Sequence, residues 1–207
     1  MLNKIKNKTI FEIKYSLSNK ISKYITKFFY KSQFGYIGFN SYIKKTDQVI
    51  GSKNIFIGDN VRIEKGAVLY AISNYSGLSY TPRIQIGNNV YINRYTNITA
   101  CNNVLIEDGV SFGPNVFICD FNHSYENLKE SIISSPLKSN GSVTIGAGSW
   151  LGANVFVSNN VKIGKHCVVA ANSVVTKSID DYCVVAGIPA KVIKKYNTEK
   201  EIWEVIK

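Results

Sequence analysis

Apolar residues recur at every sixth position over residues 145–180. The aliphatic residues that open successive frames of six are Ile145, Leu151, Val157, Ile163, Val169 and Val175. A small residue follows each of them, and the fifth place of every frame is small or apolar. A period of six fits neither a helix nor the simple alternation of an isolated strand. It predicts a repeat architecture in which each unit buries its apolar face by stacking on the next unit.

The fourth place of each frame predicts the geometry of the repeat. The residues in that place are Gly148, Asn154, Asn160, His166, Asn172 and Ser178. Gly, Asn and His are the residues that most readily tolerate a positive φ. A sharp corner in every frame gives three short strands for each coil, and the expected structure is a triangular prism of parallel β-strands.

Similar frames begin near Ile50 and continue, with interruptions, to residue 194. The earlier frames open at Ile57, Ile63, Ile86, Ile92, Ile106, Phe112 and Ile118, with a slip of register near Val104. Two stretches without the repeat, residues 71–83 and 124–142, are expected to be inserted loops. Loops of this length on a regular scaffold usually carry function.

The two flanks differ from the repeats. Residues 1–33 carry eight lysines and one acid, and the apolar residues Ile21, Tyr24, Ile25, Phe28 and Phe29 have helical spacing. This pattern predicts a basic amphipathic helix, which would pack on the prism or a neighbouring subunit, contact an anionic membrane surface, or do both. Thr198 and Glu201 have the spacing of a capping box ahead of an apolar run, and predict a short helix over residues 195–207.

The expected organisation is therefore an N-terminal helical segment (1–48), a mostly β prism (49–194) and a short C-terminal capping helix (195–207). A chain of 207 residues with a net charge of +11 suits one such domain and implies an acidic partner. That partner would be a nucleotide-like cofactor or an anionic lipid surface. Nucleic acid is disfavoured because no recognised binding motif accompanies the charge.

Composition limits the location of the protein and the use of metals. The sequence shows neither a signal peptide nor a membrane span, so we expect a cytoplasmic protein, with the basic N-terminal segment at the inner face of the membrane as an option. Four cysteines lack metal-ligand spacing and are expected to be reduced and buried. Two histidines are too few for a three-histidine zinc enzyme, so no metal is expected.

The two histidines stand in different places of the repeat. His166 occupies a corner position, which explains it fully, whereas His123 stands directly before the second loop, where no corner requires a histidine. His123 lies within the stretch 120–127, which is followed by Trp150-Leu-Gly and by Gly187-Ile-Pro-Ala-Lys-Val-Ile-Lys at the end of the prism. This ordered set, over residues 50–194, resembles the hexapeptide-repeat, left-handed parallel β-helix acyltransferases.

The resemblance is to the O-acetyltransferase branch, which includes galactoside and maltose acetyltransferases and enzymes that acetylate bacterial surface polysaccharides. It implies that the coil is left-handed and that acetyl-CoA is the acetyl donor. It also implies that His123 is the general base for a sugar hydroxyl and that the backbone amide of Ala153 stabilises the oxyanion. Asn97, Asp120 and Tyr125 would contact the acceptor; for Asp120, orienting the imidazole is an open alternative, as is neither role.

The resemblance also implies a path for the donor and a homotrimer with its ligands between adjacent prisms. Trp150 would form a wall of the thiol channel, and the pantetheine would pass Ala153 and Ala171. The remaining residues expected along this path are Thr176 and Lys177, Pro189 beside the adenine, and Lys191 and Lys194 near the phosphates.

Other functions remain possible on the same scaffold. An amino-sugar N-acetyltransferase or an antibiotic acetyltransferase would use an amine or a drug as acceptor, and an amine has less need of a base. Serine acetyltransferase is disfavoured because its helical N-terminal segment would be longer. A non-catalytic scaffold protein is the alternative outside enzymes, but it gives no reason for a histidine before a long loop.

Overall fold

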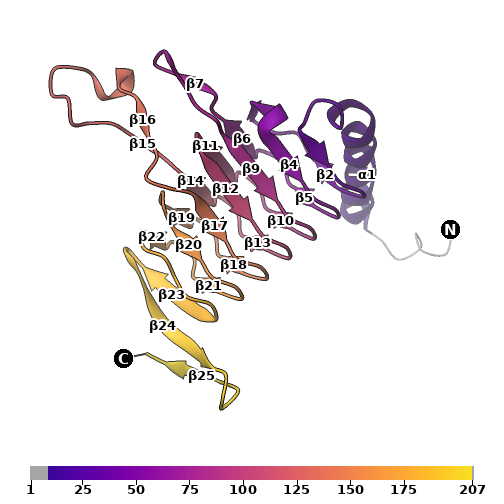
Figure 1. Cartoon of the computed structure of the whole chain (residues 1–207). Coiled ribbons are helices and arrows are strands. Elements are labelled where there is room, and N and C mark those ends of the chain that lie inside the picture. The colour runs from indigo at the N-terminus through magenta and orange to yellow at the C-terminus, as the bar shows by residue number, and fades with distance from the viewer. Residues whose placement is uncertain (1–8, 207) are drawn as a thin grey trace.

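The computed structural model describes residues 9–206, which form three parallel sheets that wind around one core (Figure 1). Each coil contributes one strand to each sheet. Sheet A consists of β1 (Tyr36–Ile37), β4 (Ile55–Ile57), β9 (Arg83–Ile86), β12 (Asn103–Ile106), β17 (Val143–Ile145) and β20 (Lys162–Ile163). Sheet C consists of β3 (Gln48–Ile50), β6 (Val68–Ala71), β11 (Asn97–Ala100), β14 (Phe117–Cys119), β19 (Phe156–Val157) and β22 (Val174–Val175).

Sheet B is the longest of the three. It consists of β2 (Tyr42–Ile43), β5 (Arg62–Ile63), β10 (Tyr91–Ile92), β13 (Ser111–Phe112), β18 (Trp150–Leu151), β21 (Val168–Val169) and β23 (Cys183–Gly187), and continues into β24 (Ala190–Asn197) and β25 (Ile202–Val205). The chain passes from sheet A to B to C within each coil. The prediction of a mostly β, left-handed parallel β-helix is confirmed.

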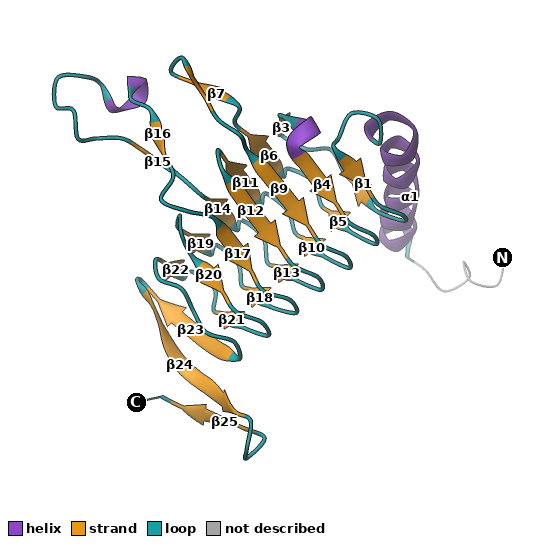
Figure 2. Cartoon of the chain, in the orientation of Figure 1, coloured by secondary structure: helices purple, strands orange, loops and turns teal. Residues whose placement is uncertain are grey.

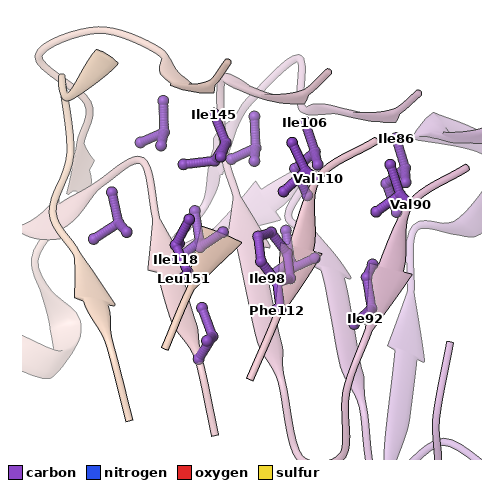
Figure 3. Packing of buried hydrophobic residues seen from close by; sticks show 14 of the residues in the cluster. Ile86, Val90, Ile92, Ile98, Ile106, Val110, Phe112, Ile118, Ile145 and Leu151 are labelled. Carbon is purple, nitrogen blue, oxygen red and sulfur yellow. The ribbon is translucent and has the colours of Figure 1, made fainter. Parts of the chain in front are cut away.

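The core is a set of aliphatic columns inside the prism (Figure 3). Ile86, Ile106 and Ile145 occupy equivalent positions of paired strands in sheet A. Ile98 and Ile118 form the matching column in sheet C, and all five side chains are almost fully buried. Each coil thus buries its inward residues against its neighbours, as the period of six predicts.

The corner prediction is confirmed for five of the six fourth-place residues in residues 145–180. Gly148, Asn154, Asn160, His166 and Asn172 all have positive φ, between 50° and 68°. Ser178 is the exception, because it has no positive φ. Its hydroxyl instead accepts the amide N–H of Lys162 at 3.0 Å.

The prism starts earlier than the sequence suggested. Residues 35–48, which the expected organisation assigns to the N-terminal helical segment, form most of a complete first coil with β1, β2 and β3. Their frames are irregular, but Ile37 and Ile43 point into the core and pair in register with Ile57 and Ile63. The expected boundary at residue 48 is therefore wrong, and the helical segment ends before β1.

The N-terminal helix α1 (Ile10–Ile25) continues into a π-helical turn, η2 (Thr26–Tyr30). Thr9 and Glu12 form a capping box at its start, and residues 1–8 of the expected basic segment lie outside the described residues. The helix packs across the first coil through Ser22 and Thr26, and the Thr26 hydroxyl accepts the N–H of Ile43 at 2.9 Å. Its apolar stripe is exposed, which the helical spacing alone did not reveal.

The expected C-terminal helix is wrong, because residues 190–205 form an antiparallel hairpin of β24 and β25 on the edge of sheet B (Figure 2). The capping box at residues 198–201 does not form. Instead, the side-chain oxygen of Asn197 accepts the N–H groups of Glu199 and Lys200, and Glu201 has a φ of 54° in the turn. Tyr196 packs edge-on against Trp203 across the two strands, with ring centroids 5.4 Å apart.

Both inserted loops leave the prism at the corner where sheet C leads into sheet A, and both project from the same edge in Figure 1. The first holds a hairpin of β7 (Asn74–Tyr75) and β8 (Leu78–Ser79). The second holds β15 (Asn122–His123), a short turn η4 (Ile132–Ser134) and β16 (Leu137–Lys138). A further turn, η3 (Ser52–Asn54), follows β3.

Candidate active site

His123 lies where the two inserted loops meet. It is in β15 and pairs with Leu137 of β16, and its half-buried ring meets the ring of Tyr75 edge-on at a centroid distance of 5.3 Å. Its Nδ1 atom is buried and has no hydrogen-bond partner among the described residues. An unpaired buried nitrogen is uncommon in a folded protein and requires an explanation, such as a catalytic role.

The first loop holds the second one in place. The hydroxyl of Tyr75 donates to the carbonyl of Ile133 at 2.6 Å, and the hydroxyl of Tyr80 accepts the N–H of Leu137 at 2.9 Å. Ser76 also donates to the carbonyl of Ser134. Sequence reasoning missed these tyrosines because nothing in a single sequence shows that the two loops pair.

Asp120 supports the second loop and does not reach its surface. The carboxylate is fully buried, and its two oxygens accept the backbone N–H groups of Cys101 and Asn102 at 2.9 and 3.0 Å. Burial raises the pKa of Asp120, and the backbone donors oppose this shift. Because Asp120 is enclosed in this way, we assign it a structural role in place of the expected acceptor contact.

Ala153 carries an unused backbone donor at the corner between sheets B and C. At the corner between sheets A and B, the N–H groups of Ala147 and Lys165 donate to the carboxylates of Glu107 and Asp181. No hydrogen bond is recorded for the N–H of Ala153 within residues 9–206. In the coil before Ala153, the position equivalent to Glu107 is Gly113, which has no side chain that could accept this N–H. An added Cβ at Gly113 would lie 2.6 Å from the nitrogen of Ala153. The free N–H can therefore serve an oxyanion.

Asn97 lies at the same corner, two coils nearer the N-terminus. It begins β11 and pairs with Phe117, which in turn pairs with Phe156 just after Ala153. The side-chain oxygen of Asn97 is buried without a hydrogen-bond partner among the described residues. Asn97 lies two strand spacings, about 10 Å, from the coil of Ala153. A polar atom without a partner at this corner suits the contact with an acceptor that the sequence suggested.

The candidate donor residues fall in line on the outer face of sheet B. Trp150 pairs with Val168, Val168 with Val184, and Val184 with Lys194 of the terminal hairpin. Adjacent strands are about 4.8 Å apart, so Trp150 and Lys194 are separated by roughly 14 Å along this row. Trp150 is 53% exposed, as a wall of a channel requires.

A β-bulge brings the two C-terminal lysines to one face. Lys191 pairs with Ala186 and Lys194 with Val184, and the register shift between Val184 and Val185 leaves Ile193 as the extra residue. Since Val184 and Ala186 share a face of their strand, Lys191 and Lys194 do so too. The remaining expected contacts, which lie on the surface, are Tyr125, Ala171, Thr176, Lys177 and Pro189.

Within one chain, His123 and Ala153 lie at the two different corners that bound sheet C, one at each end of its strands. Ala153 precedes the strand that pairs with the start of β14, whereas His123 follows the end of β14. Strand residues advance by about 3.3 Å each, so a strand of this length separates the two groups by roughly 10 Å or more. Within one chain the two groups therefore do not meet at one reacting atom. Within residues 9–206, no group of three or more His, Cys, Asp and Glu side chains could hold a metal ion.

The sequence matches known proteins over most of its length. Residues 142–177 match the model of the family described as bacterial transferase hexapeptide (six repeats). The chain is 31% identical over 189 residues to WbbJ of Escherichia coli K12, which is named as a lipopolysaccharide biosynthesis O-acetyl transferase; the match covers 87% of this chain and 88% of WbbJ. The chain belongs to the hexapeptide-repeat acyltransferase family.

A second relative supports this assignment, and a solved structure has the same fold. The galactoside O-acetyltransferase of Escherichia coli K12 is 30% identical over 162 residues, which is 76% of this chain and 71% of that enzyme. AntD, an N-acyltransferase from Bacillus cereus solved with dTDP and 3-hydroxybutyryl-CoA, superimposes with a TM-score of 0.71 over 86% of this chain and 92% of AntD. Its sequence is 22% identical, so this likeness concerns the fold. The prediction of an acyltransferase is confirmed at the level of the hexapeptide-repeat family.

Proposed function

We propose that this acyltransferase moves the acetyl group of acetyl-CoA to a hydroxyl of a sugar in a bacterial surface polysaccharide. The observation that carries the proposal is the unpaired Nδ1 of His123, held between the two inserted loops. Sequence similarity to WbbJ and to a galactoside O-acetyltransferase supports a sugar hydroxyl as the acceptor.

The chemistry needs one base and one oxyanion donor. A nitrogen of His123 accepts the proton of the acceptor hydroxyl while the hydroxyl oxygen attacks the thioester carbonyl. The N–H of Ala153 donates to the oxyanion that forms on this carbonyl. When the tetrahedral intermediate collapses, the C–S bond breaks, and the protonated imidazole returns the proton to the sulfur of the leaving thiolate. The acetyl group passes directly to the sugar, so no acyl-enzyme forms.

The residues along sheet B fit an acyl-CoA donor. Ala153 and Ala171 leave the corner open to a narrow pantetheine chain, because neither brings a long side chain to it. Lys191 and Lys194 share one face at the far end of the row, where exposed ammonium groups would attract the nucleotide phosphates. The thioester would then lie near Trp150 and the free N–H of Ala153.

A homotrimer would complete the site, since the base and the oxyanion donor lie at different corners of the prism, at the two ends of the strands of sheet C. The outer face of this sheet carries a mostly apolar row of Val68, Phe117, Phe156 and Val174, which Asn97 interrupts between Val68 and Phe117. Phe117 and Phe156 stack with ring centroids 5.5 Å apart. An apolar face of this kind is typical of the contact between subunits. His123 of one protomer would then face Ala153 of its neighbour.

The exposed face of α1 supports a place at the inner face of the cytoplasmic membrane. Leu17, Tyr24 and Phe28 are each more than half exposed, and lysines flank them. A helix of this kind lies in the interface of an anionic bilayer and does not cross it. Within residues 9–206, no helix has both the length and the apolar character needed to span a bilayer.

The experiment that tests the proposed reaction measures the release of coenzyme A from acetyl-CoA with simple sugars, nucleotide sugars and isolated surface glycans as acceptors. We expect turnover with at least one glycan, and an ester product that mild base removes. Preference for amino sugars or antibiotics over every glycan would assign the chain to the alternative acceptor class.

A further inference from the structure

We propose that the hollow between α1 and the corner of sheets B and C binds a phosphate or diphosphate group of the acceptor, so that the sugar is presented as a glycosyl phosphate. This inference rests on the proposed function and names the class of acceptor. The hollow has a volume of about 590 Å³ and is lined by residues of α1, by the residues that directly follow β2 and β5, and by Arg94. An adjoining hollow of about 400 Å³, which shares Tyr15, Glu64 and Arg94, continues along the corner to Asn115.

The walls of the larger hollow carry five cations beside an apolar strip of α1 that includes Leu17. Lys14, Lys44, Lys45, Lys65 and Arg94 face one acid, Glu64. Glu64 is almost fully buried, and Lys44 neutralises it at 2.7 Å while Tyr15 donates to its second oxygen at 3.2 Å. The other four cations make no ion pair within residues 9–206. Unpaired cations around one hollow favour an anion, and a guanidinium suits a phosphate in particular.

The residues of the corner itself depart from the repeat at this hollow. In the coils that carry Ala153 and Ala171, the two corner residues are Ala and Asn; in the coil of β10 they are Arg94 and Tyr95. Tyr95 has a φ of 59°, which is uncommon for a bulky residue and marks a position held by its surroundings. Its ring is 51% exposed and lies over Gly66, where an added Cβ would come within 2.4 Å of the ring. The exposed ring of Tyr95, with the half-buried ring of Tyr91 nearby, suits a sugar ring beside the phosphate.

The position of the hollow along the corner of sheets B and C favours the acceptor over the donor as its ligand. Lys191 and Lys194 lie on the C-terminal side of Ala153, whereas Arg94 and Lys65 lie on the N-terminal side. In the proposed function, Lys191 and Lys194 bind the phosphates of the donor. A second group of cations on the other side of Ala153 would therefore bind a different anion, the phosphate of the acceptor. Asn97, three residues after Arg94, lies in the same coil as Arg94, and the adjoining hollow reaches one coil further toward the free N–H of Ala153 at Asn115.

The binding test uses the full chain, saturated with coenzyme A so that the donor phosphates occupy their own site. Inorganic pyrophosphate is titrated by calorimetry into the wild-type protein, into the double variant Arg94→Gln with Lys65→Gln, and into the matched control Lys162→Gln with Lys165→Gln. All four side chains are exposed, and circular dichroism checks the fold of each variant. We expect the Arg94 and Lys65 variant to bind pyrophosphate about tenfold or more weakly and the control to match the wild type. Equal binding by both variants would overturn the assignment.

The activity test compares one sugar in three forms: free, as a nucleoside diphosphate sugar, and as a lipid-linked diphosphate sugar in detergent micelles. We expect a lower KM for at least one of the phosphorylated forms than for the free sugar, and loss of this advantage in the Arg94 and Lys65 variant; the preferred form identifies the source of the phosphate. Equal KM values for all three forms refute the phosphate subsite and leave the proposed acetyl transfer intact. Conversely, variant-sensitive pyrophosphate binding without acetylation of any form refutes the acetyl transfer and leaves the anion site intact.

Discussion

Asp120 anchors the second inserted loop through Cys101, whose backbone N–H donates to Oδ1 at 2.9 Å, while Oδ2 accepts the N–H of Asn102. In Asp120→Asn an amide NH₂ replaces one acceptor and faces a backbone donor. We expect a loss of about 1–3 kcal/mol in the free energy of unfolding at neutral pH, measured with urea. Asp108→Asn is the matched control, because the exposed carboxylate of Asp108 accepts the N–H of Asn88, and its replacement should cost less.

The pH dependence of this difference follows from the pKa of Asp120, which burial raises. An acid with a higher pKa in the folded state than in the unfolded state stabilises the fold fully below its unfolded pKa. This contribution is lost as the pH rises through the folded pKa. The stability gap between wild type and Asp120→Asn should therefore be largest in acid and narrow toward neutrality. A gap that widens with pH would contradict the raised pKa.

The second prediction concerns the base. His123→Ala should lower kcat by about a hundredfold or more without weakening the binding of acetyl-CoA, because proton removal is lost while the donor row of sheet B is untouched. The measurement is steady-state kinetics with the acceptor found in the screen, together with calorimetry for the donor.

His166→Asn is the control for this variant. His166 has a φ of 50° at a corner where equivalent coils have Asn, and its ring stacks on Tyr182. Asn fits this corner, so the variant should stay folded and active. If His166→Asn is folded but inactive while His123→Ala retains activity, the assignment of the base is wrong.

The repeat could be predicted from the sequence because it is local: each frame of six carries its own aliphatic residue and its own corner residue. The terminal hairpin could not, because the repeat pattern ends at β23, and β24, which follows after two residues, forms by antiparallel pairing with the edge that β23 leaves free. Local signals at Thr198 and Glu201 favoured a helix, and tertiary pairing overrode them.

In the candidate site, too, features of a single stretch could be predicted from the sequence and contacts between separate loops could not. His123 stands out in the sequence because it breaks the repeat, but its partner Tyr75 lies in another loop that has no repeat to align. Likewise, Asp120 was a reasonable acceptor contact by its position, and only its burial against Cys101 and Asn102 shows a structural use. Arg94 and Tyr95 did leave a signal, since they replace small residues and Asn at a corner.

The third prediction tests the end of the donor row. Lys191→Gln with Lys194→Gln should raise the KM for acetyl-CoA by about tenfold and change kcat little, because two charges near the phosphates are lost far from the thioester. Lys195→Gln is the matched control: it lies in the same strand, pairs with Cys183 on the other face, and makes only an exposed contact with Asp180. If Lys195→Gln raised the KM for acetyl-CoA equally, the effect would come from the general surface charge and not from a contact with the phosphates.

The fourth prediction concerns assembly. Sedimentation should show a trimer at micromolar concentration, and Phe156→Glu should shift it to monomers by placing a charge in the apolar row of sheet C, where Phe156 stacks on Phe117. Activity should fall with the trimer. Replacement of Phe39 by Glu is the control, since Phe39 is 79% exposed and lies away from that row. A wild-type monomer with full activity would exclude a site shared between chains.

The last prediction concerns the exposed stripe of α1. Leu17 and Phe28 are 55% and 63% exposed, although burial of either in an apolar environment would contribute about 1.5–3 kcal/mol. The buried face of the helix, through Ser22 and Thr26, is a different one, so Leu17→Gln with Phe28→Gln should leave the fold unchanged. We expect this variant to bind vesicles that contain anionic lipid about tenfold or more weakly than the wild type in co-sedimentation at low salt. Leu128→Gln with Ile188→Gln removes two still more exposed apolar residues elsewhere and should bind like the wild type. Equal binding by all three proteins would mean that α1 serves packing alone, because the apolar stripe would then contribute nothing to the membrane contact.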